Sequence, residues 1–268
     1  MLAFITVDLD PTLLAGPVVI RWYGVMISLA LVIGLALAMR EAGRRGIAQE
    51  EIVHIALWAV PFGLLGARLF HGIDAWKYYA TYPLQILALQ EGGMALYGGL
   101  IGGVAGGLWA ARRRGLTRWR LLDVAAPSLI MGQAIGRVGC FINGDHQGFP
   151  STLPWATSYV NHASLAIDSM PRHPAQLYEL LYDLALFSLL LILRPRLGRE
   201  GLLFLIYTTL YALGRLWISA FREDAPFLLG LKEGQLISVA VLVLAISLAV
   251  HLWRRPAVDE LPGTSPAR

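Results

Sequence analysis

Three arginine residues stand inside long apolar stretches of this sequence, where charged side chains are rare. They are Arg68, Arg137 and Arg215, and each lies roughly four to seven residues before the end of its stretch. A guanidinium group inside a bilayer costs at least a few kcal/mol, so it normally faces a bundle interior or a polar cavity and has a partner. Arg21 opens the first apolar stretch. If these stretches cross a membrane, the four side chains lie at similar depth, on the order of 6 to 10 Å below one surface.

Guanidinium groups at one level favour an anion site, because the planar N–H fork of arginine matches the oxygens of a phosphate. The structural alternative is that Glu179 and Asp183, four residues apart on one helix face, neutralise them. Two carboxylates cannot match four guanidinium groups one to one. A lone arginine at the interface, such as Arg21, is more often structural.

The composition indicates that membrane-spanning helices position these residues. Of 268 residues, 56% are hydrophobic and only 15% charged, and the mean hydropathy is +0.59. Soluble domains are nearer a quarter charged. The single cysteine, Cys140, excludes an intramolecular disulfide and a zinc site built from cysteines. We expect no metal and no cofactor.

We predict an all-α integral membrane protein with about seven transmembrane helices, each of which needs about 20 apolar residues. The expected spans are approximately residues 18–39, 52–73, 92–111, 124–142, 176–193, 201–221 and 234–253. Residues 1–255 are expected to form a single membrane domain with a small cap at approximately 143–175, followed by a disordered tail at 256–268. A glycine repeat with a period of four, around Gly98 and Gly102, predicts close helix packing.

The basic residues indicate the orientation. With seven spans, fourteen of the 22 Lys and Arg residues fall on the side of the C-terminus and five on the opposite side. The positive-inside rule then places the C-terminus and its tail in the cytoplasm, and the N-terminus and the periplasmic or extracellular cap outside. The positive charge is therefore mainly a topology signal, so we expect membrane lipids as partners and no nucleic acid. The anion available to the arginines is a phospholipid head group of the outer leaflet.

Residues 136–148 carry the most distinctive motif, Gly-Arg-Val-Gly-Cys-Phe-Ile-Asn-Gly-Asp-His-Gln-Gly. It resembles the signature Gly-Arg-x-Gly-Asn-Phe-x-Asn-x-Glu-x-x-Gly of the prolipoprotein diacylglyceryl transferases. Further stretches similar to that family follow the same order, at residues 21–24, 92–94, 98–102, 172–179 and 211–215.

The resemblance implies a transferase of the bacterial cytoplasmic (inner) membrane, multi-pass, with its active site facing the outer leaflet. Its members move the diacylglyceryl group of phosphatidylglycerol to the thiol of the lipobox cysteine in prolipoprotein signal peptides. The reaction forms a thioether, releases glycerol phosphate and is the first step of lipoprotein maturation. The implied partners are therefore phosphatidylglycerol and prolipoprotein signal peptides. The resemblance also implies that Arg137 and Arg215 are essential, and we assign to both the stabilisation of the leaving phosphate.

The remaining site residues are expected from the family positions or from their place on the outer side. The substrate-binding set is Arg137, Tyr23, Asn143, Asp145, Gly148, Tyr211, Arg21, Arg68, His173 and Glu179. Tyr97 joins the catalytic set because the family often has a histidine there, proposed as the base. A phenol with a pKa of about 10 is a poor base, so its expected role is hydrogen bonding or packing. Cys140 and Ser219 also depart from the family, which has Asn and commonly Glu at these positions.

The acceptor thiol has an ordinary pKa of about 8.5 and must be activated. We expect the positive field of the arginines to favour the thiolate, and His146 or His173 to be the alternatives as a base. Cys140 is expected to be a small buried residue, neither nucleophile nor lipidation acceptor.

Two other functions remain open from the sequence. The same arginines would serve a transporter or flippase of an anionic lipid or sugar phosphate, although the duplicated halves typical of transporters are not visible. An intramembrane protease is the third interpretation, and no Gly-x-Ser-Gly or paired-aspartate motif supports it.

Overall fold

The computed structural model describes residues 4–14, 19–87, 93, 95–166, 168–228 and 230–254. Within this part of the chain the α-helices are α1 (Trp22–Arg44), α2 (Gln49–Asp74), α3 (Trp76–Thr81), α4 (Leu96–Arg113), α5 (Arg118–Asn143), α6 (Ala175–Leu193), α7 (Leu202–Ser219) and α8 (Glu233–Arg254). The 3-10 helices are η1 (Pro83–Leu87) and η3 (Arg194–Arg196). Helix therefore dominates the fold.

Short strands pair two by two outside the long helices. β1 (Ile5–Val7) runs parallel to β4 (Thr157–Tyr159), with Ile5 opposite Thr157. Two antiparallel pairs join β2 (Thr12–Leu14) to β3 (Ile20–Arg21), and β5 (Pro226–Leu228) to β6 (Leu231–Lys232). With two or three residues each, these strands add only a small amount of β-structure to a helical protein.

Six described helices are long and apolar enough to cross a membrane, namely α1, α2, α5, α6 with its 3-10 extension, α7 and α8. They confirm the prediction of a helical integral membrane protein. The expected third span corresponds to α4, whose 18 residues include many glycines and end in two arginines. Its hydropathy is accordingly lower, and the count of seven spans stays a prediction. Gly92 and the tail at 256–268 lie outside the described residues.

Several helices differ in their bounds from the expected spans. α1 begins at Trp22, because Ile20 and Arg21 form β3, and it continues to Arg44. α5 begins at Arg118, six residues before the apolar stretch. Polar ends of this kind continue the helical hydrogen bonding beyond the apolar residues from which a span is recognised.

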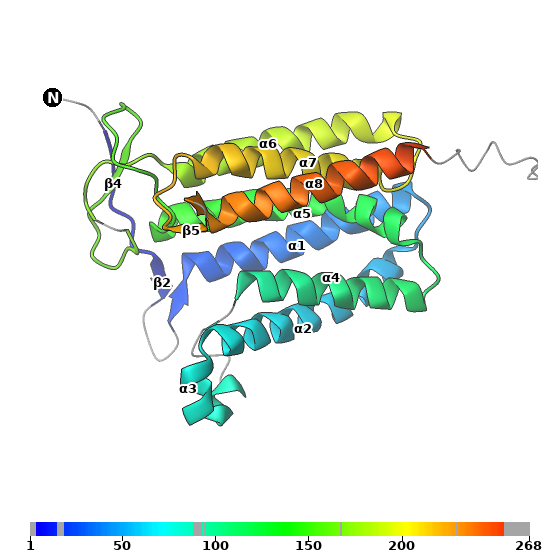
Figure 1. The fold of residues 1–268 in the computed structure, drawn as a ribbon, viewed down its shortest axis with the longest axis horizontal. Helices are drawn as coiled ribbons and strands as arrows, with labels where there is room; N and C mark the ends of the chain where they lie inside the picture. Colours follow the sequence, from blue (N-terminus) through cyan, green and yellow to red (C-terminus); the bar gives the residue numbers. More distant parts are fainter. Residues whose placement is uncertain are drawn as a thin grey trace, which may run out of the picture. The chain divides into compact units, whose positions relative to one another are not determined.

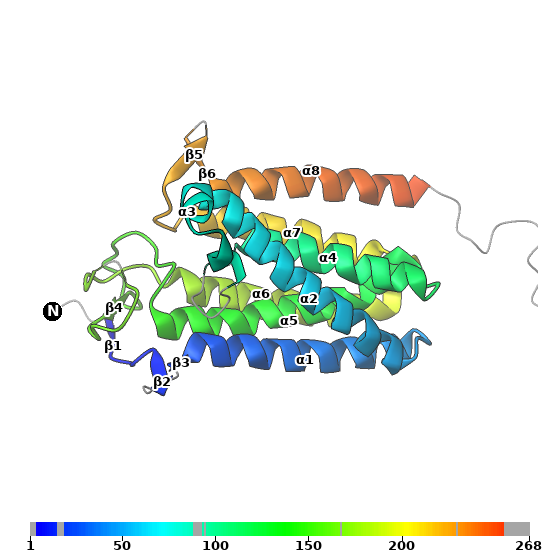
Figure 2. The ribbon, with the colours of Figure 1, turned by 90° about the horizontal axis from the view of Figure 1, so that it is seen from below.

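The chain divides into two compact units, and the single domain over residues 1–255 stays a prediction. The first unit comprises residues 1–34 and 125–268. Within it, α5, α6, α7 and α8 run side by side, and β4 and β5 lie at the end where α6 and α8 begin (Figure 1, Figure 2). Its apolar core is formed by Ala126, Ile130, Leu186, Leu190, Leu203 and Tyr207. This architecture brings the end of α5, the start of α6 and the end of α7 to one end of the unit.

The second unit, residues 35–124, is organised by the packing of α2 against α4. Both views show these helices side by side (Figure 1, Figure 2). A Cβ added at Gly66 would collide with the carbonyl oxygen of Gly98 and would lie 3.1 Å from the Cα of Gly102. The prediction of close packing at the glycine repeat is therefore confirmed.

Replacing Gly66 with alanine is expected to destabilise this helix pair by about 1 to 3 kcal/mol, as overpacking commonly does. Gly43→Ala is the matched control, because a Cβ at Gly43 meets no atom within 4 Å. Thermal unfolding in detergent, followed by tryptophan fluorescence, should show a lower midpoint for Gly66→Ala alone. Equal midpoints for the two variants would contradict the close contact.

Candidate functional site

The carboxylate of Glu179 is the centre of an arginine cluster, which we define as Arg137, Arg215 and Arg222. The Nε of Arg137 contacts one carboxylate oxygen, and the Nη1 of Arg215 contacts the other. The Nη1 of Arg222 lies 3.3 Å from the same oxygen as Arg215. Only 5% of Glu179 is exposed. Three cationic groups thus surround one buried anionic group.

The helix ends place these four side chains together. Arg137 lies six residues before the end of α5, and Arg215 lies four residues before the end of α7. Glu179 is in the second turn of α6, and Arg222 follows α7 by three residues. Because α5 and α7 end where α6 begins, the arginine cluster and its carboxylate share one level of the first unit.

Arg137 and Arg215 keep unused hydrogen-bond donors, because each has fewer carboxylate contacts than Arg222. Arg222 donates to both carboxylate oxygens of Asp224, at 2.9 and 3.1 Å, besides its contact with Glu179. The side chains of Arg137 and Arg215 retain 17% and 20% exposure. A guanidinium has five N–H donors, so one contact to Glu179 leaves donors on each for a further anion. The arrangement suits a phosphate better than a neutral ligand.

Several expected site residues border Arg137. A Cβ added at Gly139 would lie 3.3 Å from the Cα of Tyr23, so α1 and α5 meet closely beside the arginine. The Cys140 thiol lies 4.0 Å from Nη1 of Arg137 and is buried, which confirms the expectation that it is a buried residue. Tyr211 is within electrostatic range of Arg137.

The motif loop that follows α5 is tied to the start of α6. Asn143 is the last residue of α5, and the Asp145 carboxylate lies 3.2 Å from Nδ1 of His146. Gly148 donates its backbone N–H to the carbonyl of His173 at 2.9 Å and forms a β-bridge with Arg222. A Cβ at Gly148 would lie 2.7 Å from the Cβ of His173, so only glycine allows this approach.

His173 is held in place by an aromatic neighbour. Its Nδ1 lies 3.1 Å from the hydroxyl of Tyr178, which also accepts a hydrogen bond of 2.9 Å from the Trp155 indole. These contacts fix the orientation of the ring two residues before the start of α6.

Arg172 fixes the cap next to Gly148. Its guanidinium is 4% exposed and binds the Asp168 carboxylate at 2.7 Å, Glu223, and the carbonyl of Gly148 at 3.3 Å. The hydrogen bonds to Asp168 and Glu223 raise the pKa of Arg172, and the bond from Arg172 is the main cause that lowers the pKa of Asp168 to about 2. In the same cap, burial raises the pKa of the Tyr159 hydroxyl, which donates to the carbonyl of Phe141 at 2.5 Å.

Three further expected site residues lie in β3 and in the second unit. Arg21 is exposed in β3, where its backbone pairs with Thr12. Arg68 and Tyr97 belong to the second unit. The guanidinium of Arg68 donates to the backbone carbonyls of Gln85, Ile86 and Gly93 at 2.5 to 2.9 Å.

Sequence reasoning missed Arg222 and Gln176. Arg222 lies beyond the apolar stretch and counted only as a topology residue, although it follows Arg215 by seven residues, two helical turns. Gln176 lies three residues before Glu179 and donates its side-chain N–H to the backbone carbonyl of Asp145. In both cases the available signal was the spacing from a charged residue already singled out, which is Arg215 for Arg222 and Glu179 for Gln176.

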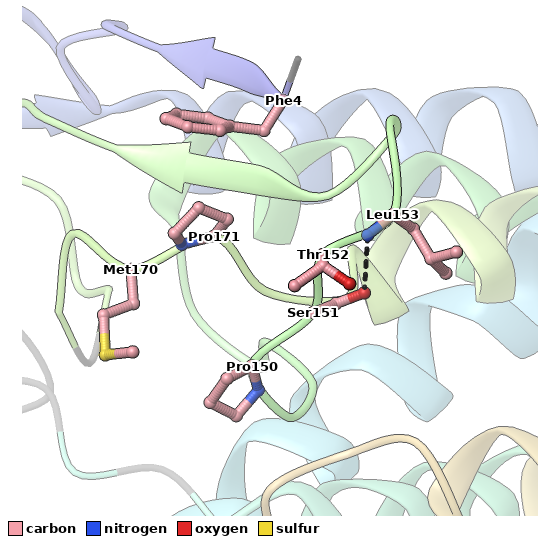
Figure 3. A pocket seen from close by; sticks show the side chains of 7 residues that line it. All are labelled: Phe4, Pro150, Ser151, Thr152, Leu153, Met170 and Pro171. Atoms are coloured by element: carbon pink, nitrogen blue, oxygen red, sulfur yellow. Dashed lines mark hydrogen bonds between the residues drawn. The ribbon is translucent and has the colours of Figure 1, made fainter. Parts of the chain in front are cut away.

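A separate hollow of about 490 Å³ opens in the cap. Figure 3 shows Phe4 and Met170 on its walls, with Ser151 accepting a hydrogen bond from the backbone N–H of Leu153. The other lining residues are Pro150, Thr152, Leu153 and Pro171. This hollow has no charged lining residue, in contrast to the arginine cluster. Among the described residues, no group of three His, Cys, Asp or Glu side chains is placed to hold a metal ion.

Comparison with known proteins agrees with this geometry. The family model described as prolipoprotein diacylglyceryl transferase matches residues 11–251. The chain belongs to this family. A phosphatidylglycerol–prolipoprotein diacylglyceryl transferase of Geobacillus kaustophilus is 44% identical over 87% of the chain and 88% of its own length. The protein of the same name from Bacillus velezensis is 38% identical over 91% of the chain and 92% of its own length.

Within the prolipoprotein diacylglyceryl transferase family, this chain is a multi-pass membrane protein whose signature motif surrounds Arg137. One position that departs from the family signature, Cys140, lies 4.0 Å from Arg137. At the other, a Cβ built at Gly234 would lie 3.5 Å from the hydroxyl of Ser219 and 3.6 Å from Nε of Arg215, so Gly234 faces both side chains.

Proposed function

We propose that the chain transfers the diacylglyceryl group of phosphatidylglycerol to the lipobox cysteine of prolipoproteins, at the outer leaflet of the bacterial inner membrane. The observation that carries this proposal is the arginine cluster on Glu179, at the end of the first unit where the cap lies. The names of the relatives support the substrates, and the distribution of basic residues supports seven spans with the N-terminus outside.

In the proposed reaction, Arg137 and Arg215 bind the phosphate of phosphatidylglycerol. The thiolate of the acceptor cysteine attacks the glyceryl carbon that bears the phosphate ester. The new carbon–sulfur bond forms as the carbon–oxygen bond breaks, and the electron pair leaves with glycerol phosphate. The thiol proton passes to solvent or to the released phosphate. Since negative charge grows on the leaving oxygen, preorganised guanidinium groups stabilise the transition state more than the bound lipid.

Glu179 and Arg222 position the two phosphate-binding arginines in this proposal. A carboxylate between guanidinium groups offsets their mutual repulsion and fixes the direction of their remaining donors. Arg222 is itself held by Asp224 and by the β-bridge to Gly148. Tyr23, Asn143, Asp145, Gly148 and Tyr211 stay proposed substrate-binding residues. Arg21, Arg68 and His173 stay proposed as substrate-binding too, and Tyr97 stays in the proposed catalytic set.

The positive field of the arginines activates the thiol in this proposal, without one strong base. His146→Ala and His173→Ala are therefore expected to reduce transfer by less than about tenfold, a small part of what general-base catalysis commonly contributes. Initial rates of peptide modification between pH 6 and 9 measure this. If either variant folds normally and has lost all transfer, the histidine is the base and the field alone is insufficient.

Mass spectrometry of the acceptor peptide tests the function itself. Purified protein is incubated in vesicles with phosphatidylglycerol and a lipobox peptide. The peptide should gain the mass of one diacylglyceryl group, and a Cys→Ser version of the peptide should gain none. An unchanged mass for the cysteine peptide would refute the transferase function.

A further inference from the structure

Three buried acceptor oxygens without a hydrogen-bond donor belong to residues at the end of α5, just after it and at the start of α6. They are Oδ1 of Asn143, Oδ1 of Asp145 and Oε1 of Gln176, each buried with no partner among the described residues. Gln176 is 1% exposed and Asn143 is 6% exposed. Buried polar atoms are nearly always paired, so an unpaired group calls for an explanation, such as an absent ligand.

The orientation of the Gln176 amide is fixed by its partner. The backbone carbonyl of Asp145 can only accept a hydrogen bond, and Nε2 of Gln176 donates to it. The amide oxygen must therefore point away from this carbonyl, toward a place where no protein donor meets it.

Gln176 lies one helical turn from the centre of the arginine cluster. Gln176 and Glu179 are three residues apart in α6, so they share one helix face. Gln176 is nearer the start of the helix, roughly 4.5 Å further toward the cap along the axis. Asp145, which holds it, follows by two residues the end of α5, the helix that carries Arg137. The unpaired oxygen therefore lies on the cap side of the proposed phosphate site.

The head group of phosphatidylglycerol provides hydrogen-bond donors for these acceptor oxygens. With its phosphate at the arginines and its acyl chains in the bilayer, the head-group glycerol must point toward the cap. This glycerol carries two neutral hydroxyl donors. Hydroxyl donors of this kind fit the unpaired acceptor oxygens of Asn143, Asp145 and Gln176.

We propose that Oε1 of Gln176 accepts a hydrogen bond from a hydroxyl of the lipid's glycerol head group and so makes the protein selective for this head group. Asn143 and Asp145 supply neighbouring acceptors for the second hydroxyl. The inference rests on the proposed transferase function. It adds the residue that recognises the head-group glycerol, which leaves with the phosphate.

The test compares phosphatidylglycerol with phosphatidylpropanol, which has the same charge and no head-group hydroxyl. The two lipids are mixed equally in one vesicle, and one carries isotope-labelled acyl chains, so the mass of the modified peptide reports its donor. The wild-type protein is expected to use phosphatidylglycerol at least about tenfold more often, because the analogue leaves buried acceptors unpaired.

Gln176→Met removes the acceptor with little change in length. We expect it to lower transfer from phosphatidylglycerol about tenfold, and transfer from phosphatidylpropanol less than about twofold. Thr157→Val is the matched control, since it deletes another fully buried oxygen without a partner, in the cap strand β4. This control should keep the wild-type preference.

Equal use of both lipids by the wild-type protein would overturn the inference, even if Gln176→Met fails to fold. An equal loss with both lipids in folded Gln176→Met would also overturn it, because that is the effect of a structural role alone. If the wild-type protein modifies the peptide with neither lipid, the proposed function itself has failed, and the inference with it.

Discussion

Replacing Arg137 with methionine is expected to lower kcat/KM for diacylglyceryl transfer by about 10²- to 10³-fold, the usual effect of removing one preorganised donor from developing negative charge. Arg137 contacts Glu179 and keeps part of its guanidinium exposed for a phosphate. The variant should stay folded, because Arg215 and Arg222 continue to pair with Glu179. The loss therefore reports transition-state stabilisation and not unfolding.

Rates of peptide modification and thermal unfolding midpoints measure this prediction together. Arg137→Lys keeps the charge but not the planar fork, so most of the activity should still be lost. Arg118→Met, at an exposed position at the start of α5, is the matched control and should behave as the wild type. A folded Arg137→Met protein with wild-type kcat/KM would show that the arginine cluster does not bind the reacting phosphate.

Replacing Glu179 with glutamine is expected to destabilise the protein by about 3 to 5 kcal/mol, as removal of one partner from a buried ion pair commonly does. The three guanidinium groups would then lose the carboxylate that contacts all of them, and 94% of the Glu179 side chain is buried. Transfer should fall as well, because the donors of Arg137 and Arg215 lose their common anchor.

A double variant tests whether repulsion between the guanidinium groups causes the loss of stability in Glu179→Gln. In Glu179→Gln with Arg222→Gln, one of the repelling charges is gone, so part of the lost stability should return. Glu50→Gln, at an exposed position of α2, is the control and should be neutral. If the double variant were less stable than the sum of the single changes, repulsion between the guanidinium groups would not be the cause.

The helices followed from the sequence, because a continuous apolar stretch has few structures other than a membrane helix. Successive spans run in opposite directions, so the sequence also predicted that Arg137 and Arg215 lie at one depth. The structure brings both to Glu179. Here local composition was enough, since each helix is specified by its own residues.

The missed features depend on contacts between distant segments. Arg222 reaches Glu179 because the chain leaving α7 pairs with Gly148, 74 residues earlier. No local sequence pattern predicts that β-bridge. β1 and β4 are three residues each, too short for a periodic signal, and they meet across 150 residues of sequence. The contacts of Arg68 with the carbonyls of Gln85, Ile86 and Gly93 likewise depend on how the chain folds back, which no local pattern specifies.

The central claim is that the arginine cluster stabilises a leaving phosphate while the diacylglyceryl group passes to a thiol. The most direct measurement follows phosphorus by NMR in vesicles of phosphatidylglycerol that contain the purified protein, with and without lipobox peptide. Glycerol phosphate should appear only with the peptide and in equal amount to the thioether product, and should not appear with Arg137→Met. Phosphatidylglycerol that stays intact, or that merely changes leaflet, would contradict the claim and favour a transporter.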